Sequence, residues 1–291
     1  MTVWCFGSIN IDHFYSLEHL PAPGETLAAS GYRVELGGKG ANQSVAAARA
    51  GATVRHLGAI GADGDRALAG LIAQGVNCDS VQRIEGPTGH AVIMLDQYGE
   101  NSIITEAGAN RKMALEPVLA ALEQADLADI LLLQNETAFQ PEIAEAAMGR
   151  GMEVIYSAAP FEIGAVRAVL PYVNTLVMNA VEAAQLRAAL DVPFEDLPVE
   201  AVVITRGAEG ASWHARGTPD IFVPALPTKV VDSTGAGDCF TGALAASFSM
   251  GAAPEDAMLF AAAAAAIQVS RPGTSAAMPL RAEIEKLVFT T

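Results

Sequence analysis

The chain has 291 residues, of which 51% are hydrophobic and 17% charged, and 33 acidic against 17 basic residues give a formal net charge of −16. This apolar content excludes intrinsic disorder, and the acidity excludes nucleic acid and anionic membrane surfaces as partners. The longest unbroken apolar run, residues 257–267, is shorter than the roughly 20 residues that cross a bilayer. Three scattered cysteines and no basic residue before Arg33 predict a cytoplasmic protein without a disulfide framework or signal peptide.

Short apolar strands alternate with helical segments along the chain. Strands are predicted at residues 3–9, 54–60, 130–134, 153–157, 175–178 and 201–205. Helices are predicted at residues 41–50, 65–74, 142–150, 180–190, 237–250 and 254–269. This alternation predicts an α/β fold, in which a mostly parallel central sheet carries helices on both faces.

Two stretches, residues 12–35 and 89–107, break this alternation. They have the pattern of strand–turn–strand units, with strands expected at residues 13–18, 27–35, 90–96 and 101–106. These four strands predict a small β-sheet inserted into one domain that spans residues 1–291. Ligands of parallel α/β sheets bind at the carboxyl ends of the strands, so the inserted sheet would act as a lid that excludes water.

The segment Gly-Ala-Gly-Asp at residues 235–238 precedes a predicted helix. Glycines on both sides of Ala236 allow successive amides to point one way, and amides at a helix N-terminus bind anions. Asp238 is then placed to take a proton from a hydroxyl that attacks a phosphoryl group. The alternative is an acidic turn that only caps the helix.

A second glycine-rich segment, residues 37–42, also opens a helix, but it lacks the Walker spacing of phosphate loops. The alternative is a hinge between the lid and the main domain. Asn10 and Asp12, at the end of the first predicted strand, lie on one face if the chain stays extended. A polar, acidic pair there suits the hydroxyl groups of a ligand, and the alternative is a plain turn.

The remaining candidates follow later strands. Asn179 and Glu182 lie three residues apart at a helix start, where they would hold magnesium through water or form an N-cap. Gly207 and Gly210 follow a strand and suit either a hairpin or the wall of a nucleotide site. The dinucleotide fingerprint GxGxxG is absent after the first strand, which disfavours a dinucleotide oxidoreductase.

Taken in order, these segments resemble the motifs of the ribokinase-like carbohydrate kinases, the PfkB family. The matching segments are residues 7–12, 23–26, 37–43, 108–110, 179–182 and 235–238. The resemblance runs essentially end to end. It implies the α/β fold with an inserted lid, and ATP and Mg²⁺ as cofactors. The implied reaction is phosphoryl transfer to the primary hydroxyl of a sugar, with D-ribose as the first choice. It also implies activation by a monovalent cation, usually K⁺, and a homodimer formed through the lid sheets.

The resemblance also implies roles for single residues. Asp238 would be the catalytic base, and the amides of Gly235, Ala236, Gly237 and Asp238 would form the anion hole. The positions that match sugar ligands are Asn10, Asp12, Gly38, Lys39, Asn42 and Glu136. The positions that match the nucleotide site are Asn179, Thr205, Arg206, Gly207, Ala208, Glu209, Gly210 and Gly237, with Glu182 at the magnesium–water site. The positions that match the cation loops, mostly through backbone carbonyls, are Asp232, Thr234, Gln268, Arg271 and Gly273.

Five features depart from the family pattern. Ser233 replaces a Thr, residues 157–160 read Ser-Ala-Ala-Pro in place of Asn-Pro-Ala-Pro, and residues 179–182 keep only the outer pair of their motif. Ala262 replaces a His near the adenine, and Ala277 replaces a Ser that helps to bind the cation. The sugar positions are intact, whereas the nucleotide positions have changed. Two alternatives to a ribose kinase stay open: the same chemistry on fructose, another pentose, a deoxy-sugar acid or a nucleoside, and a sugar-sensing binding protein. The intact Asp238 motif argues against the sensor.

Overall fold

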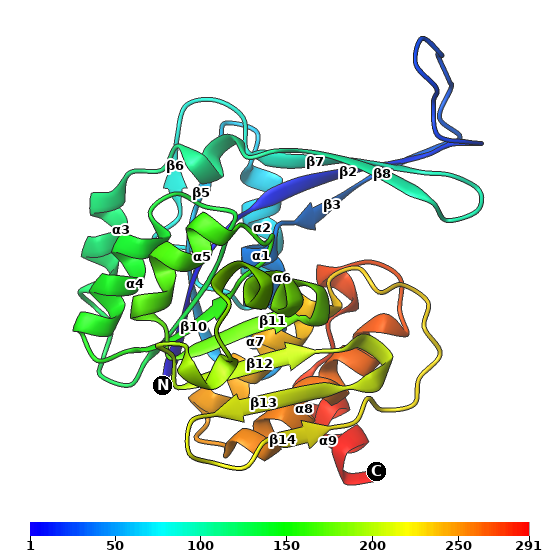
Figure 1. The fold of residues 1–291 in the computed structure, drawn as a ribbon. Coiled ribbons are helices and arrows are strands. Elements are labelled where there is room, and N and C mark those ends of the chain that lie inside the picture. The colour runs from blue at the N-terminus through cyan, green and yellow to red at the C-terminus, as the bar shows by residue number, and fades with distance from the viewer. Residues whose placement is uncertain (291) are drawn as a thin grey trace.

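The computed structural model, which describes residues 1–290, is built on an eight-stranded sheet (Figure 1). The parallel strands are β1 (Thr2–Phe6), β4 (Thr53–Leu57), β9 (Ile130–Gln134), β10 (Glu153–Ser157), β11 (Thr175–Asn179) and β12 (Ala201–Thr205). The antiparallel strands β13 (Ala211–Ala215) and β14 (Ile221–Val223) form one edge. The order is β14-β13-β12-β11-β10-β9-β1-β4. The predicted, mostly parallel sheet is confirmed.

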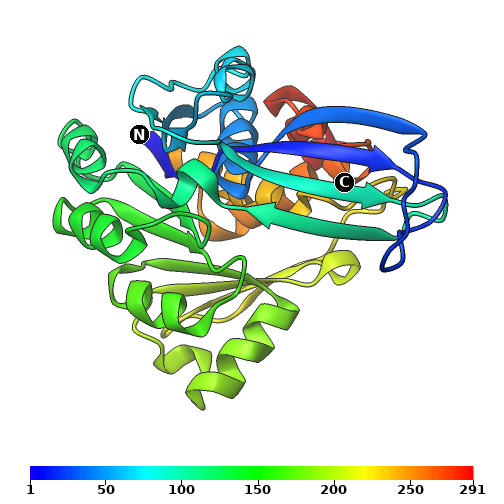
Figure 2. The same ribbon diagram turned by 90° about the horizontal axis from the view of Figure 1, so that it is seen from above.

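Helices cover both faces of this sheet (Figures 1 and 2). One face carries α1 (Lys39–Arg49), α2 (Asp65–Ala73), α7 (Ala236–Ser249), α8 (Pro254–Val269) and α9 (Arg281–Thr290). The other carries α3 (Leu115–Leu122), α4 (Gln140–Gly149), α5 (Ile163–Val169) and α6 (Ala180–Leu190). Side chains of β1 alternate between the two cores, Val3 and Cys5 in one and Trp4 and Phe6 in the other. No helix within residues 1–290 is long and apolar enough to cross a membrane.

A separate four-stranded sheet projects from this body (Figure 2). It consists of β3 (Gly31–Gly37), β2 (Asn10–Ser16), β7 (Gly89–Leu95) and β8 (Asn101–Glu106), in that order. We refer to it as the lid sheet. Strand β2 pairs in parallel with β7, and the other two pairings are antiparallel. The four predicted strands therefore exist and form one sheet; β8 has the predicted bounds, β7 is shifted by one residue, and the ends of β2 and β3 differ by two to four residues.

One placement is wrong: Asn10 and Asp12 do not lie at the end of the first strand but open the lid strand β2. The strand β1 ends at Phe6 because the chain leaves the sheet at Gly7. A Cβ atom at Gly7 would lie 2.5 Å from the Cα of Gly40, so only a glycine lets the backbone pass the start of α1. This exit carries the polar residues from the sheet edge into the lid.

The shorter elements escaped prediction. Helices α3 and α5 have eight and seven residues, too few for a helical period to stand out; α9 and the edge strands β13 and β14 were also not predicted. The predicted strand at residues 54–60 is divided into β4 and β5 (Ala59–Ile60), which pairs with β6 (Gln82–Arg83). Single 3-10 turns occur at Gly108–Arg111, Leu170–Tyr172, Phe194–Asp196, Gly207–Glu209 and Ser275–Ala277.

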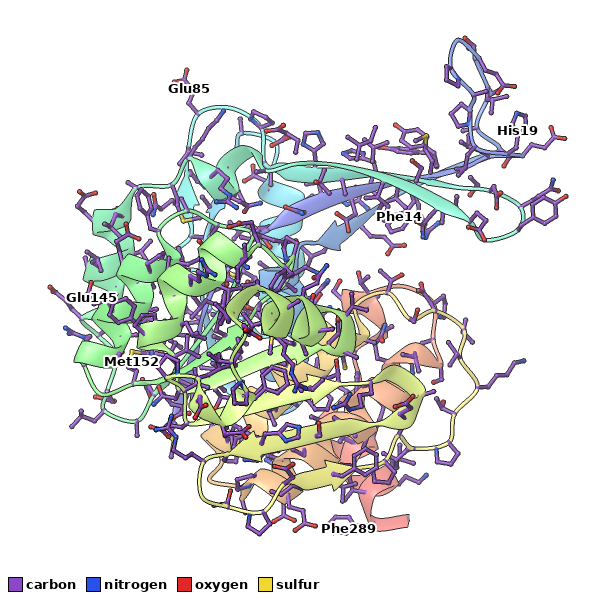
Figure 3. All side chains as sticks on the ribbon, in the orientation of Figure 1. Phe14, His19, Glu85, Glu145, Met152 and Phe289 are labelled. Carbon is purple, nitrogen blue, oxygen red and sulfur yellow. The ribbon has the colours of Figure 1, made fainter. Side chains whose placement is uncertain are left out.

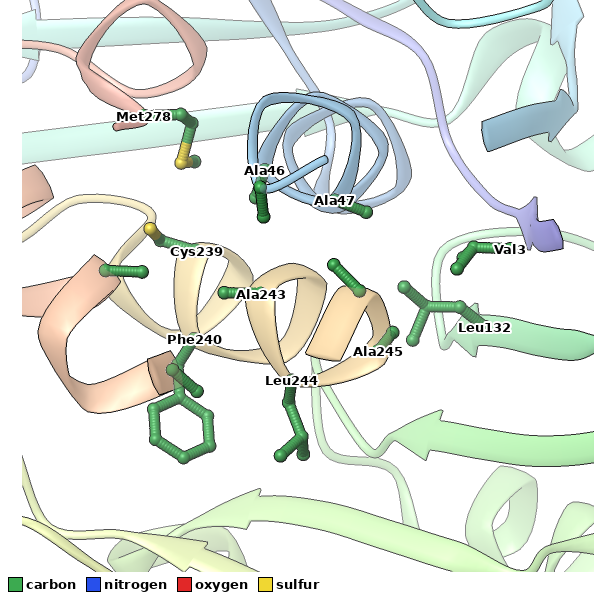
Figure 4. Packing of buried hydrophobic residues seen from close by; sticks show 14 of the residues in the cluster. Val3, Ala46, Ala47, Leu132, Cys239, Phe240, Ala243, Leu244, Ala245 and Met278 are labelled. Carbon is green, nitrogen blue, oxygen red and sulfur yellow. The ribbon is translucent and has the colours of Figure 1, made fainter. Parts of the chain in front are cut away.

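Small side chains bring α1 and α7 into close contact (Figure 4). A Cβ atom at Gly242 would lie 2.4 Å from the carbonyl oxygen of Gln43 and 2.7 Å from the Cβ of Ala46. Ala46 of α1 and Ala243 of α7 are both buried in the same core. These small residues therefore let α1 and α7 pack at close range. The first turns of the two helices meet at the carboxyl ends of the strands.

Candidate active site

Asp238 lies in the first turn of α7 and is only 7% exposed. Its Oδ2 accepts a hydrogen bond from Nδ2 of Asn42 at 3.1 Å, and its Oδ1 accepts one from Nε2 of Gln43 at 3.0 Å. Gln43 Oε1 in turn accepts from Nε2 of Gln134 at 2.6 Å. Both carboxylate oxygens are thus held by α1, which differs from the alternative of an acidic side chain that only caps its own helix.

The turn before Asp238 presents free backbone amides. Gly235 is the N-cap of α7 in the left-handed conformation, φ 78°, and makes no side-chain cap. Helix geometry leaves the amides of Gly237 and Asp238 without intrahelical acceptors. Nothing lies within 4 Å of a Cβ atom built at Gly237. This arrangement can receive an anion at the positive end of the helix dipole.

Charged side chains gather around this helix end. Lys39 begins α1, and the negative charge of Asp238 is the main reason that its pKa is raised, against the opposing effect of burial. Glu136 and Glu182 raise the pKa of Lys39 further. Burial raises the pKa of Glu182, partly offset by the amide of Asn179 and the charge of Lys39. Lys39 therefore stays protonated, a local positive charge on an acidic protein.

Two buried acceptors on the lid side of this cluster have no hydrogen-bond partner. They are Oδ1 of Asp12 and Oδ1 of Asn42. Burial, followed by the negative charges of Glu136 and Glu35, raises the pKa of Asp12 from 3.8 to about 7. Buried polar atoms are nearly always hydrogen-bonded, so these two oxygens are suited to a ligand that brings hydroxyl donors.

The neighbouring side chains fix the loops around these acceptors. Glu136 Oε2 accepts hydrogen bonds from the hydroxyl of Ser8 and from the amide of Lys39, the latter at 2.9 Å. Asn10 Oδ1 accepts from Nδ2 of Asn110 at 2.8 Å, and Asn110 Oδ1 accepts from the amide of Ile9 at 3.0 Å. The end of β1, the start of β2 and the start of α1 are therefore joined by side chains.

Glycines 37 and 38 allow this close approach. A Cβ atom at Gly37 would lie 2.0 Å from Oδ2 of Asp12, so the carboxylate rests against bare backbone. Gly38 has φ 90°, and a Cβ atom there would lie 2.9 Å from the carbonyl oxygen of Ser8. The segment between β3 and α1 joins the lid sheet to the body, as the hinge alternative expects, and it also lines the candidate site.

A cavity of about 540 Å³ lies beside the free amides of α7. Its walls include most of the predicted nucleotide positions, Thr205, Gly207, Ala208, Gly210 and Gly237, and the apolar residues Leu226, Phe240, Ala262, Ala265, Ala266 and Val269. The segment after β12 is therefore both a turn into the antiparallel β13 and a wall of this cavity. Three predicted nucleotide positions, Asn179, Arg206 and Glu209, are not among its lining residues.

A larger hollow, about 1110 Å³, lies along the opposite edge of the sheet. Ile130, Glu153, Thr175 and Ala201, each the first residue of its parallel strand, line it. Ligands of open α/β sheets bind at the carboxyl ends of the strands. Position and chemistry therefore favour the smaller cavity as the functional one.

Comparison with known proteins decides the family. The family model described as "pfkB family carbohydrate kinase" matches residues 2–281. The chain belongs to the PfkB family of carbohydrate kinases. The kinase is 35% identical over 303 residues to a ribokinase of Schizosaccharomyces pombe, covering 96% of this chain and 95% of that relative.

Solved structures agree with this membership. Ribokinase from Thermotoga maritima superposes with a TM-score of 0.91 at 33% identity, covering 100% of both chains. Arabidopsis thaliana ribokinase, solved in complex with ribose and ATP, gives a TM-score of 0.87 at 32% identity and covers 99% of this chain and 98% of that one. The predicted family and the ribokinase-like fold are confirmed.

The predicted magnesium pair of the kinase forms a capping box. Asn179 Oδ1 accepts from the amides of Val181 and Glu182, and Glu182 Oε2 accepts from the amide of Asn179 at 2.8 Å. The N-cap alternative is thus present, and it uses one oxygen of Glu182. Within residues 1–290 no three His, Cys, Asp or Glu side chains group as metal ligands. Since Mg²⁺ is commonly held by one carboxylate, waters and substrate phosphates, Glu182 still fits a water-mediated role.

Two of the carbonyl oxygens predicted to bind K⁺ are engaged by a side-chain amide in this structure. The carbonyl oxygens of Thr234 and Gly273 both accept hydrogen bonds from Nε2 of Gln268, at 2.8 and 3.1 Å. Asp232 binds the amides of Thr234 and Gly273 through its two oxygens. The carbonyl oxygen of Gln268 accepts from the amide of Arg271 at 3.0 Å, and the side chain of Arg271 pairs with Glu283. The side-chain nitrogen of Gln268 therefore lies between the carbonyl oxygens of Thr234 and Gly273.

Sequence reasoning gave no role to three residues that hold the candidate site together. Gln43 orients Asp238, Asn110 orients Asn10, and Ser8 binds Glu136. All three lie inside segments that carried the family resemblance. Their positions in these motifs could have marked them as site residues, but only the fold shows which groups they contact.

Proposed function

We propose that this kinase transfers the γ-phosphoryl group of ATP to the primary hydroxyl of D-ribose, which gives ribose 5-phosphate. The pair of buried, unpartnered acceptors, Asp12 Oδ1 and Asn42 Oδ1, carries the proposal. A polyhydroxyl ligand satisfies such acceptors by donating hydrogen bonds. The similarity to ribokinases over the full chain favours ribose among the sugars.

The sugar would lie between the lid sheet and the start of α1. Asp12 and Asn42 would accept from its ring hydroxyls, while Asn10, Gly38, Lys39 and Glu136 would shape the rest of the pocket. Closure of the lid sheet would exclude water, which otherwise competes with the sugar for the phosphoryl group. We infer that this sheet is an insertion into one domain.

Asp238 would act as the general base. Its carboxylate takes the proton of the attacking hydroxyl, the oxygen forms a bond to the γ-phosphorus, and the bond from phosphorus to the leaving ADP oxygen breaks. Hydrogen bonds from Asn42 and Gln43 keep the carboxylate oriented. The amides at the start of α7 and the charge of Lys39 stabilise the negative charge that develops on the transferring group.

The apolar cavity beside Gly237 would hold the adenine, because its walls are mostly small hydrophobic side chains. The amide of Ala236 donates to the carbonyl oxygen of Ser233 at 3.2 Å, which leaves the amides of Gly235, Gly237 and Asp238 for the phosphates. Mg²⁺ bound with ATP neutralises phosphate charge, and Glu182 would hold it through water. Backbone dipoles and one lysine thus substitute for the basic surface that a net charge of −16 does not provide.

The exposed face of the lid sheet is a candidate for the homodimer. Tyr32 and Ile104, which the strand register places on one face of this sheet, are each more than half exposed. Figure 3 shows the side chains along this sheet, with Phe14 on it and His19 in the loop beyond. Large apolar residues on projecting strands favour a second copy as the partner. Size-exclusion chromatography with light scattering tests this: a monomer at micromolar concentration would contradict it.

The substrate is tested by ADP release with ribose, 2-deoxyribose, fructose, a deoxy-sugar acid and inosine. We expect the highest kcat/KM with ribose and a kcat lower by about 10²–10⁴ for Asp238→Ala, with ribose binding retained in calorimetry. Asp256→Ala, on the exposed start of α8, is the matched control and should behave as wild type. A better substrate in the panel replaces ribose, and sugar binding without ADP release would support the sensor instead.

A further inference from the structure

The side chain of Gln268 joins the two loops that border the anion-binding turn. Gln268 lies in the last full turn of α8 and is completely buried. Its Nε2 donates to the carbonyl oxygen of Thr234 at 2.8 Å and to that of Gly273 at 3.1 Å. One amide group therefore connects the loop that precedes α7 with the loop that follows α8.

Chemistry fixes the orientation of this amide. Carbonyl oxygens are acceptors only, so without a cation between them the NH₂ group faces Thr234 and Gly273, since a flipped amide would place three oxygens together. Gln268 Oε1 is buried without a hydrogen-bond partner, so the two donor bonds alone hold the amide. The group brings a partial positive charge to a point where two backbone carbonyls converge, the kind of site that a K⁺ ion takes.

Two side chains that could serve a cation here are engaged or lack an oxygen. Asp232 accepts from the amide of Thr234 at 2.9 Å and from that of Gly273 at 3.1 Å. Burial by itself raises the pKa of Asp232, but hydrogen bonds from Thr234 and Gly273 outweigh burial and lower it. Ala277 carries no hydroxyl group. The two loops are thus crosslinked entirely by groups of this chain.

The crosslink acts on the turn that presents the free amides. Thr234 directly precedes Gly235, the left-handed N-cap of α7. The side chain of Thr274, next to Gly273, lies 3.5 Å from a Cβ atom built at Gly235. Any movement of either loop would therefore change the direction of the amides at Gly235 and Ala236.

We propose that the amide of Gln268 takes the place of a monovalent cation in ordering this turn, so that phosphoryl transfer by this kinase does not depend on K⁺. Gln268 is then a positioning residue, because it touches neither sugar nor nucleotide. The inference rests on the proposed kinase function but not on which sugar is used. The response to K⁺ can be measured with whichever sugar the panel selects.

The test compares KCl with choline chloride at an equal ionic strength of about 0.1 M. Wild-type kcat and KM for ATP should differ by less than about twofold between the salts. Gln268→Ala removes the amide and leaves two carbonyls unpartnered. Its kcat should fall about tenfold in choline, as expected for the loss of one or two hydrogen bonds, and K⁺ should restore it.

Gln268→Glu is the second variant and nearly preserves the volume. Its carboxylate would repel the two carbonyls unless a cation lies between them, so it should also become K⁺-dependent. Gln124→Ala, an exposed glutamine bonded to Arg55 far from the site, is the matched control without any K⁺ response. As a readout without substrate, K⁺ should raise the Tm of both Gln268 variants but leave that of the wild type unchanged.

Two results would overturn the proposal. The first is K⁺ activation of the wild-type kinase above about twofold over choline. The second is full activity of both Gln268 variants in choline. If a variant fails to fold, the wild-type response still decides. If no sugar yields ADP, the proposed function fails instead, and the effect of K⁺ on Tm still tests the crosslink.

Discussion

Ionisation of the Asp12 carboxyl group should destabilise the folded protein, and a single substitution should reveal this effect. Burial, Glu136 and Glu35 raise its pKa from 3.8 to about 7. The folded state therefore binds this proton more tightly than the unfolded state. The contribution of Asp12 to the free energy of unfolding should fall as the pH rises from about 4 to about 7 and stay constant above that.

The size of the effect follows from the shift. Each pH unit over which only the unfolded state is ionised removes about 1.4 kcal/mol, so the full loss reaches at most about 4 kcal/mol above pH 7. Asp12→Asn has the same shape and no charge. Relative to wild type, the variant should gain stability as the pH rises, by as much as about 4 kcal/mol between pH 4 and pH 8.

Asp12→Asn should weaken sugar binding, although it stabilises the fold at neutral pH. Asp12→Asn removes a buried charged acceptor, so KM for the sugar should rise by about tenfold or more, since hydrogen bonds to charged groups contribute about 1.5–3 kcal/mol. In the wild type, KM for the sugar should increase as the pH falls below about 7, because protonation removes the carboxylate. Initial rates at pH 6, 7 and 8 measure this.

Denaturant unfolding at several pH values, with Asp12→Asn beside the wild type, measures the stability part. Asp63→Asn provides a control of opposite sign. The hydrogen bonds from Thr88 outweigh burial and lower the pKa of Asp63, so its stabilisation is present at neutral pH and is lost in acid. A stability difference for Asp12→Asn that does not vary with pH would refute the reasoning.

Three further predictions concern packing, the nucleotide cavity and the thiols. Gly242→Ala should lower the free energy of unfolding by about 1–3 kcal/mol and also lower kcat, because its Cβ would meet the backbone of Gln43 at 2.4 Å; Gly149→Ala, with nothing within 4 Å, should do neither. Ala262→Trp should fill the cavity and raise KM for ATP by about tenfold without affecting KM for the sugar, and equal effects on both would contradict the cavity assignment. Burial raises the pKa of all three thiols, that of Cys5 to about 11, so none should react with Ellman's reagent at pH 8 until guanidinium unfolds the protein; rapid reaction of the native protein would count against this burial.

Much of the architecture was accessible from local pattern. The buried strands at residues 130–134, 153–157 and 201–205 match β9, β10 and β12 in both bounds, because unbroken apolar runs between turns specify parallel strands covered on both faces. The lid strands were found because their pattern differs from that of the surrounding helices. The bounds of β8 were predicted correctly, but those of the other three lid strands were not, since a strand end depends on its pairing partner, as at Gly31 opposite Ser16.

The candidate site, like the fold, was predictable from the sequence only in part. The sequence by itself determined that an acidic residue follows a glycine-rich turn at a helix start, and that acidic and amide groups accompany it at other strand ends. Only the tertiary structure decided that Asn42 and Gln43, 196 and 195 residues away, hold the carboxylate of Asp238. It also decided that the amide of Gln268 bridges two loops. Hydrogen bonds are directional and short, so they depend on how closely α1 and α7 pack, and no local pattern in the chain records that distance.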